Sequence, residues 1–459
     1  MLRDYIGNKR FYKRIMALAL PIMIQNGITQ FVNMLDNVMV GATGTVPMTG
    51  VAITNQLLFV FNLCVFGAVS GAGIFGAQFF GNKDREGVRH TFRFKLIFCT
   101  ILCAVGIVVF ALAGDPLVSL YLKGEGDPAD ALAALGYARE YLGVMLIGLF
   151  PYTIAQCYSS TMRECGKSLV PMISGVSAVG VNLVFNYILI FGKLGAPALG
   201  VKGAAIATVL SRFVELGILI VWTRLHKEDY PYFVGAYRSL YVPPRLVGRI
   251  FAKGLPLMFN ETFWALGMAT LNQCYSLRGL DVVAANNICQ TFSNVFMVVF
   301  QAVGVAIGIH LGHRLGAGHM RRAAADARRL ITFSVLVSLV VSVVFAVSAQ
   351  WIPLIYNTTP EVRSMASSLM RITAAVFVFD AFANASYFTL RSGGQTFITI
   401  LFDSCFTWVI CVPVALILSQ GTDLPILGLY AVVQSLNFIK CVLGYIMVKR
   451  GYWLRTIVQ

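Results

Sequence analysis

Long apolar segments, separated by short polar loops, make up most of this chain of 459 residues. Each segment has about 20 residues or more, the length that an α-helix needs to cross a lipid bilayer. The segments are continuous apolar runs, whereas the strands of a membrane β-barrel alternate between apolar and polar residues. The pattern therefore predicts an all-α membrane protein with twelve transmembrane helices, which we place at residues 15–40, 50–79, 92–113, 134–159, 168–191, 203–223, 252–276, 284–312, 329–350, 366–390, 396–418 and 427–448.

A polar linker at 224–250, rich in proline and basic residues, divides these segments into two sets of six. Because six is even, both sets enter the membrane in the same direction. We therefore expect an N-terminal lobe at 1–223 with spans 1 to 6 and a C-terminal lobe at 251–459 with spans 7 to 12. Lobes of this kind are related by an axis along the membrane normal.

The two halves also share motifs at matching positions. Pro21 and Gly81 lie 60 residues apart in the first half, and Pro256 and Gly316 lie 60 residues apart in the second. The offset between these pairs is 235 residues, and a second set of matches has an offset of 228 residues: Arg163, Gly166 and Ser168 with Arg391, Gly394 and Thr396. Internal repeats of this size in an apolar chain are typical of secondary transporters, with the binding site between the halves.

The composition agrees with a membrane protein. Hydrophobic residues are 58% of the chain and charged residues 12%, about half of the roughly 25% charged residues of soluble proteins. The net charge of +16 could indicate a nucleic-acid partner in a soluble protein. Here most Lys and Arg residues fall in the termini and in loops that share one side, which is the positive-inside pattern. We therefore expect no nucleic-acid partner, and a monomeric multi-pass protein in the plasma membrane (the bacterial inner membrane) with both termini in the cytoplasm.

Five acidic residues lie within the predicted spans: Asp36, Glu215, Glu261, Asp380 and Asp403. An ionisable group inside the hydrocarbon region costs about 2.5–3.5 kcal/mol on insertion scales, so each one needs a physical reason. Glu215 has Arg212 three residues earlier on the same helix, and Asp403 lies at the depth of Lys440 in the neighbouring span. We interpret both as members of structural ion pairs.

Glu261 and Asp380 are the strongest candidates for a cation site. Counted from Lys253 and Arg391, they lie about 12 Å and 16 Å from the same side of the membrane. Two carboxylates in a pocket with amides suit Na⁺ or a shared proton. The alternative is two unrelated carboxylates, each protonated and hydrogen-bonded to a neighbouring helix.

Polar and large side chains that follow the two acids at helical spacing, together with one face of span 8, are predicted to line a substrate cavity. In the C-terminal half these are Trp264, Asn286, Gln290, Asn294, Met297, Asn384 and Tyr387. Asn55 matches Gln290 across the repeat, and Asn26 occupies the position that corresponds to Glu261. The lobes thus share a scaffold but not their carboxylates.

Asp36 is a further candidate in the N-terminal half, toward the outer end of the first span. Asn33 precedes it by one helical turn, and Asn182 and Asn186 in span 5 lie at a similar depth. Asp36 therefore either takes part in cation binding or is an interfacial residue that reaches the outer water.

Motifs of soluble catalytic chemistry are absent. There is no Walker lysine motif, no glycine-rich loop after a strand and no nucleophile elbow. Gly76, Gly81, Gly312 and Gly316 are predicted to be C-caps and tight turns at the cytoplasmic face. We expect neither an enzyme nor a cofactor, and the ten cysteines show no spacing typical of a disulfide or metal framework.

These motifs together resemble the multidrug and toxic compound extrusion (MATE) family, over nearly the whole chain. The resemblance is carried by the Leu20-Pro21 pair with Asp36 and Met39-Val40-Gly41, by Gln78 with Gly81, by Leu315-Gly316-Ala317-Gly318, and by Leu390-Arg391-Ser392-Gly393-Gly394. It implies two six-helix lobes in a V, and export of cationic or lipophilic compounds in exchange for Na⁺ or H⁺.

Within the family, Glu261 and Asp380 resemble the cation-site acids of the NorM-like branch. Two positions depart from the pattern. Asn186 stands where archaeal members have a second Asp, and Val376 stands where the NorM-like site has a Tyr. A lipid-linked oligosaccharide flippase of a related fold is the alternative function, but a site for diphosphate lipids should be rich in Lys and Arg. A non-transporting membrane sensor would need a soluble signalling domain, which we do not find.

Overall fold

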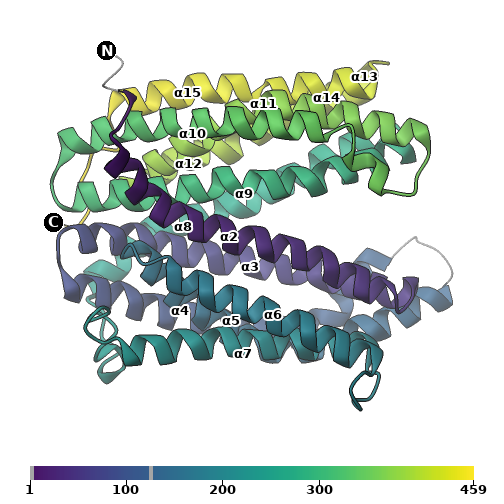
Figure 1. Ribbon diagram of the computed structural model, residues 1–459, viewed down its shortest axis with the longest axis horizontal. Coiled ribbons are helices and arrows are strands. Elements are labelled where there is room, and N and C mark those ends of the chain that lie inside the picture. The colour runs from purple at the N-terminus through teal and green to yellow at the C-terminus, as the bar shows by residue number, and fades with distance from the viewer. Residues whose placement is uncertain (1–4, 123–127, 459) are drawn as a thin grey trace. The chain divides into compact units, whose positions relative to one another are not determined.

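The computed structural model describes residues 5–122 and 128–458, and every regular element in these residues is helical. The helices of the first half are α2 (Lys9–Gly41), α3 (Thr45–Gly81), α4 (Arg85–Leu122), α5 (Pro128–Glu164), α6 (Leu169–Phe191) and α7 (Gly200–Leu225) (Figure 1). Those of the second half are α8 (Pro244–Ser276), α9 (Leu280–Gly316), α10 (Met320–Ser348), α11 (Pro360–Ser392), the stretch Thr396–Gly421 and the stretch Ile426–Arg450. Each predicted span therefore corresponds to one helical stretch, and the prediction of an all-α protein with twelve transmembrane helices is confirmed.

Eleven of these described helical stretches are long and apolar enough to cross a membrane. The exception is α8, which begins with Arg245, Arg249 and Lys253 and carries Asn260 and Glu261 near its middle. Polar residues in a spanning helix are characteristic of functional positions. The helix that departs from the apolar pattern thus carries Glu261, one of the three candidate cation-site acids.

The last two spans are irregular. The first contains α12 (Thr396–Ile400), two π-helical segments, η3 (Leu401–Cys405) and η4 (Thr407–Cys411), and then α13 (Val412–Gly421). The second is interrupted at Leu436, between α14 (Ile426–Ser435) and α15 (Asn437–Arg450). Apolar spacing could not predict these features, because a π-helical segment has the same composition as a regular one. Segments of this kind are frequent at functional sites.

The chain forms two compact units. The first comprises 1–23, 77–83 and 251–459, and the second comprises 24–76 and 84–250. Both are discontinuous in sequence because α2 and α3 contribute residues to each. In the first unit, aromatic packing is dense: the rings of Phe345 and Phe377 stack with centroids 5.0 Å apart, and both side chains are fully buried.

The repeat is visible in the turns that follow corresponding helices. After α5 and α11, Gly166 and Gly394 both have positive φ, at 80° and 73°. Each glycine N–H donates to the carbonyl three residues earlier, Arg163 or Arg391, at 2.9 Å. The match of these residues at an offset of 228 therefore reflects the same turn, made twice.

The prediction that four repeated glycines are C-caps and tight turns needs correction. Gly81 and Gly316 do end α3 and α9, but Gly76 and Gly312 lie inside these helices, and none of the four has a positive φ. Instead, each is a point of close packing. A Cβ atom on Gly76 would overlap the carboxylate of Glu164, and one on Gly312 would lie 2.9 Å from the Cβ of Ala77.

The C-terminal residues after α15 fold back into the first unit. The amide of Ile457 donates to Gln78 Oε1 at 2.8 Å, and Gln78 Nε2 donates to the carbonyl of Ser392 at 2.9 Å. Trp453 is fully buried and donates to the carbonyl of Val448 at 3.1 Å. Gln78, which the sequence analysis singled out beside Gly81, is thus a structural residue.

Candidate cation sites

Asp36 on α2 is held by amides from α6. Asn186 Nδ2 donates to Asp36 Oδ1 at 2.7 Å, and Asn186 is buried. The amide of Asn182 lies 3.0 Å from Asp36 Oδ2 and donates to it when its nitrogen takes that position. The predicted common depth of these residues is confirmed. A role of Asp36 in cation binding stays a prediction.

Among the described residues, no hydrogen bond joins the remaining candidates of the first half, Asn26, Asn33 and Asn55, to Asp36. Asn55 is exposed and accepts a hydrogen bond from the hydroxyl of Tyr141 at 3.3 Å. Asn33 is exposed, and Asn26 is half-buried. Their cavity-lining role is untested.

Glu261 lies on α8 and takes its hydrogen bond from α11. The hydroxyl of Tyr387 donates to Glu261 Oε1 at 3.3 Å. The charged groups that act on Glu261 are the guanidinium of Arg391 and the carboxylate of Asp403. Tyr387, a predicted cavity-lining residue, is therefore a direct partner of the acid.

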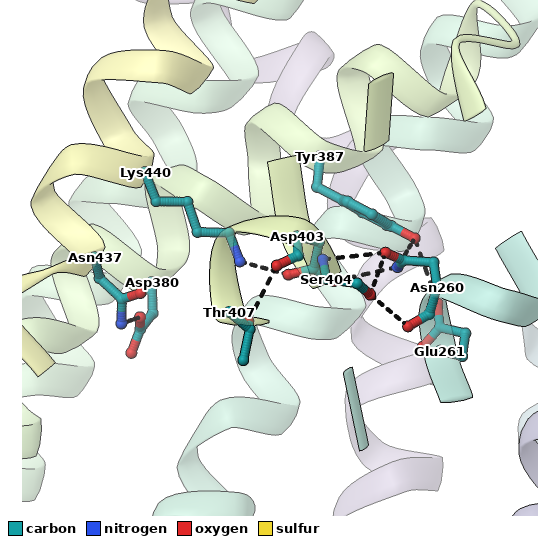
Figure 2. A network of polar contacts seen from close by, with 9 residues as sticks. All are labelled: Asn260, Glu261, Asp380, Tyr387, Asp403, Ser404, Thr407, Asn437 and Lys440. Atoms are coloured by element: carbon teal, nitrogen blue, oxygen red, sulfur yellow. Dashed lines mark hydrogen bonds and ion pairs between the residues drawn. The ribbon is translucent and has the colours of Figure 1, made fainter. Parts of the chain in front are cut away.

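Asp380 on α11 takes its hydrogen bond from a different helix. Asn437 Nδ2, in the first turn of α15, donates to Asp380 Oδ1 at 2.8 Å. No hydrogen bond joins Glu261 to Asp380 among the described residues, and Figure 2 shows the pair of Asp403 and Lys440 drawn between them. The shared site of Glu261 and Asp380 stays a prediction.

The predicted ion pair of Asp403 and Lys440 is confirmed. Lys440 Nζ on α15 lies 2.5 Å from Asp403 Oδ1 in the π-helical segment η3. The other oxygen, Asp403 Oδ2, accepts from Asn260 Nδ2 at 3.2 Å. Lys440 also acts electrostatically on Asp380, so one ammonium group serves two carboxylates.

Asn260 is the residue that the sequence reasoning missed. It is fully buried, and its nitrogen also lies 3.4 Å from the hydroxyl of Tyr387. Ser404 Oγ lies 2.7 Å from the carbonyl oxygen and 2.7 Å from the side-chain oxygen of Asn260, which share its one hydrogen, and the Ser404 amide donates to the side-chain oxygen at 3.3 Å. The repeat could have found Asn260, because an offset of 235 places it opposite another amide, Gln25, which accepts from Arg163 at 2.6 Å.

The other cavity candidates of the second half lie on α8, α9 and α11. Asn286 is buried and donates to Asn272 Oδ1 at 3.2 Å. The side-chain oxygens of Asn286 and Asn384 are buried without a hydrogen-bond partner in the described residues. Trp264, Gln290 and Met297 are half-buried, and Asn294 is exposed. Unpaired buried oxygens need a partner, which makes these positions suited to a polar ligand or water.

Comparison with known proteins identifies the family. The MatE family model matches the chain twice, at residues 21–188 and 256–417. The chain belongs to the MatE family. The two matches begin at Pro21 and Pro256, the positions from which the sequence repeat was inferred.

Individual MatE relatives agree over most of the chain. It is 25% identical to the probable multidrug resistance protein NorM of Thermotoga maritima over 443 residues, which covers 96% of this chain and 93% of the relative. It is 28% identical to the multidrug resistance protein MdtK of Yersinia pseudotuberculosis over 383 residues, 83% of this chain and 81% of the relative. This MatE chain is therefore a membrane transporter and not an enzyme.

Solved structures show the same fold. An outward-facing multidrug resistance MATE family transporter of the MOP superfamily matches with a TM-score of 0.88 at 21% identity, over 98% of both chains. A MOP superfamily transporter from Pyrococcus furiosus matches with a TM-score of 0.87 at 21% identity, over 99% of this chain and 98% of that chain.

The two departures from the MATE pattern have clear places in the structure. Asn186 contacts Asp36 directly, so the N-terminal site contains one carboxylate and amide groups. Val376 is buried one turn before Asp380, where it offers no polar atom. The phenol near the C-terminal acids is supplied instead by Tyr387, at Glu261.

Proposed function

We propose that this protein is a cation-coupled antiporter that exports cationic or lipophilic small molecules by alternating access. Glu261 and Asp380 bind the coupling ion, Na⁺ or H⁺, and Asp36 contributes in the N-terminal half. The protein works without a resident cofactor, as a monomer in the plasma membrane with both termini in the cytoplasm. Its named relatives, which are multidrug resistance proteins, support the substrate class.

The observation that best supports this proposal is a difference in the partners of the buried acidic residues. Asp36, Glu261 and Asp380 accept hydrogen bonds only from neutral amide or hydroxyl groups, and none forms an ion pair in the described residues. Asp403, another acid of the predicted spans, pairs with Lys440 at 2.5 Å. Glu215 forms no ion pair in the described residues, so its predicted pair with Arg212 is wrong, although Arg163 and Arg212 act on it electrostatically. Two acids outside the predicted spans also have basic partners within hydrogen-bond distance. Glu164 pairs with Lys95 at 2.6 Å, and Asp326 pairs with Arg314 at 2.9 Å.

This contrast has a direct energetic meaning. A carboxylate away from water is costly unless a positive charge or a proton compensates it. Glu261 and Asp380 form no ion pair in the described residues, so a transported cation or proton supplies the compensation. The site is then stable in a dry environment only when the ion is bound.

Coupling follows when ion and substrate favour different states of the transporter. The coupling ion stabilises one conformation by its differential affinity, and the substrate, bound in the central cleft, stabilises the other, so the two compete through the conformational equilibrium. The acids and amides argue against an anionic diphosphate lipid, because the one lysine in this network, Lys440, is already paired with Asp403.

The test is efflux from proteoliposomes. A fluorescent cationic dye is loaded, and its efflux is followed under an imposed Na⁺ gradient or an imposed pH gradient. We expect one of the gradients to accelerate efflux. If neither gradient changes the rate in either membrane orientation, coupled antiport is wrong.

A further inference from the structure

A continuous network of hydrogen bonds and one ion pair connects Lys440 to Glu261. Lys440 pairs with Asp403, Asp403 accepts from Asn260, Asn260 reaches the hydroxyl of Tyr387, and that hydroxyl donates to Glu261 (Figure 2). The carboxylate that this network connects to Glu261 is that of Asp403. Asp380 is not part of this network, but the positive charge of Lys440 acts on its carboxylate.

Asn260, in the middle of this network, is held by several contacts, whereas Lys440 at its end has a flexible side chain. Asn260 is fully buried and is held by the hydroxyl of Ser404 at 2.7 Å and by the backbone amide of Ser404 at 3.3 Å. Lys440 carries a compact ammonium group on a flexible stem, which can change partners as an arginine fork cannot. The side chains of Asp403 and Lys440 retain 18% and 15% of their accessible surface, so an ion can reach them.

The ammonium group of Lys440 also acts electrostatically on a second carboxylate, that of Asp380. Asn437, one helical turn earlier on α15, donates to Asp380, so the same face of α15 serves Asp380 and Asp403. The helix is interrupted at Leu436, immediately before this turn, and Asp403 lies in a π-helical segment. Both irregular backbones adjoin the ion pair.

The charged groups in and near this network have a net charge of one negative unit when all are ionised. Three carboxylates, those of Glu261, Asp380 and Asp403, face two cations, Lys440 and Arg391. One monovalent cation or proton makes the set neutral. No three His, Cys, Asp or Glu side chains converge as metal ligands in the described part of the chain. The donors are therefore two carboxylates with neutral oxygens, which suits a monovalent ion better than a transition metal.

We infer that Asp403 is a ligand of the coupling cation together with Glu261, and that Lys440 is an internal cation that the coupling ion displaces from Asp403 toward Asp380. This inference rests on the proposed antiport function and refines its ion site: Asp403 takes the place of Asp380 as the second direct ligand, and Asp380 acts indirectly. In the ion-free state Lys440 neutralises Asp403. When the ion binds between Asp403 and Glu261, Lys440 moves to Asp380, so that each carboxylate keeps a positive partner. Asp380 thereby acts on the cation site through Lys440.

The experiment measures the cation concentration that gives half-maximal dye efflux in proteoliposomes, using whichever of Na⁺ or H⁺ drives the wild type. Lys440→Gln removes the competing ammonium group. We expect its half-saturating concentration to fall by at least about tenfold, because Coulomb competition at the site is lost. Its maximal efflux rate should also fall, because the ion is released more slowly. A merely structural role for Lys440 would lower the rate without increasing cation affinity.

Two further variants make the test independent of whether Lys440→Gln folds. Lys440→Arg keeps the charge but holds a carboxylate more firmly, and should raise the half-saturating concentration severalfold. Asp403→Asn removes a ligand and should raise it as well. The matched control is Lys449→Gln, an exposed residue nine positions later on α15, which should behave as the wild type.

The outcomes separate the two proposals. If neither gradient drives the wild type, antiport itself fails, and the inference fails with it. If the wild type is driven but folded Lys440→Gln or Lys440→Arg has an unchanged half-saturating concentration, the displaced lysine is wrong and antiport stands. A half-saturating concentration that rises in Lys440→Gln also overturns the inference.

Discussion

Gly316, the last residue of α9, lies so close to Gln78 near the end of α3 that a Cβ atom on it would overlap the Gln78 carbonyl oxygen. The reciprocal contact joins Gly81 to His313 in the same way. Gln78 and Gly81 correspond to His313 and Gly316 across the repeat offset of 235. The repeated glycines are therefore required by two equivalent helix crossings, and only a residue without Cβ fits there.

Gly316→Ala should destabilise the protein by about 1–3 kcal/mol, because the added methyl group forces the two backbones apart. Thermal unfolding in detergent measures this effect. The matched control is Gly143→Ala in α5, where a Cβ meets nothing within 4 Å. That change should be neutral or slightly stabilising. Equal melting temperatures for the two variants would contradict the packing role of Gly316.

The membrane topology gives the second prediction. A cysteine introduced at Lys227 in the 224–250 linker should react with a membrane-impermeant maleimide only from the cytoplasmic side, because the basic loops should remain there. A cysteine at Asn357, between α10 and α11, should react only from the outside. Both side chains are exposed, and a variant without the native cysteines provides the background. Labelling of position 227 from outside would show that the orientation is wrong.

Several features of the fold and site could be predicted from the sequence. The apolar spacing predicted the twelve helices, and the two offsets of 235 and 228 residues predicted the repeat. The pair of Asp403 and Lys440 followed from similar depth in neighbouring spans, because a buried charge requires an opposite one.

Other features could not be predicted, for physical reasons. The π-helical segments around Asp403 change which side chains share a face, but they leave the composition unchanged. Asn260 carries no charge, so the energetic argument that marks membrane acids did not mark it. The glycines at 76 and 312 were assigned to caps because a sequence shows no tertiary neighbours, and close helix packing selects glycine as strongly as a turn does.

The role of the N-terminal acid gives the third prediction. In the described residues, the hydrogen-bond partners of Asp36 are the amides of Asn186 and Asn182, and no second carboxylate there shares an ion with it. Asp36→Asn should lower transport partially and leave cation affinity near that of the wild type. Asp380→Asn should weaken cation binding strongly. Cation binding measured by calorimetry decides between them, and an equal loss in both variants would refute this ranking.

Tyr387 gives the fourth prediction. Its hydroxyl donates to Glu261 and lies next to Asn260, while its ring lies under the guanidinium of Arg391. Tyr387→Phe keeps the ring and removes the donor. We expect cation-driven efflux to fall by about tenfold, with a loss of stability of only about 1 kcal/mol. Tyr445→Phe on the exposed face of α15 is the control. Unchanged efflux in Tyr387→Phe would exclude the phenol from the site.

The final prediction concerns Glu261 and Asp380 together. Neutralising either acid removes the negative charge that the coupling ion compensates. Glu261→Gln and Asp380→Asn should therefore each abolish cation-driven efflux, while the folded protein still binds the dye. Dye binding by fluorescence anisotropy and thermal unfolding in detergent are the two controls on the folded state.

The double variant tests whether the two acids act as one unit. Their hydrogen-bond partners differ, Tyr387 for Glu261 and Asn437 for Asp380, and the pair of Asp403 and Lys440 connects their charges. If they act through one ion, the double variant should be little worse than either single variant, because effects within a coupled network are not additive. Residual efflux in each single variant that is lost only in the double variant would show two independent sites. Such a result would also remove the reason for Lys440 to exchange between Asp403 and Asp380.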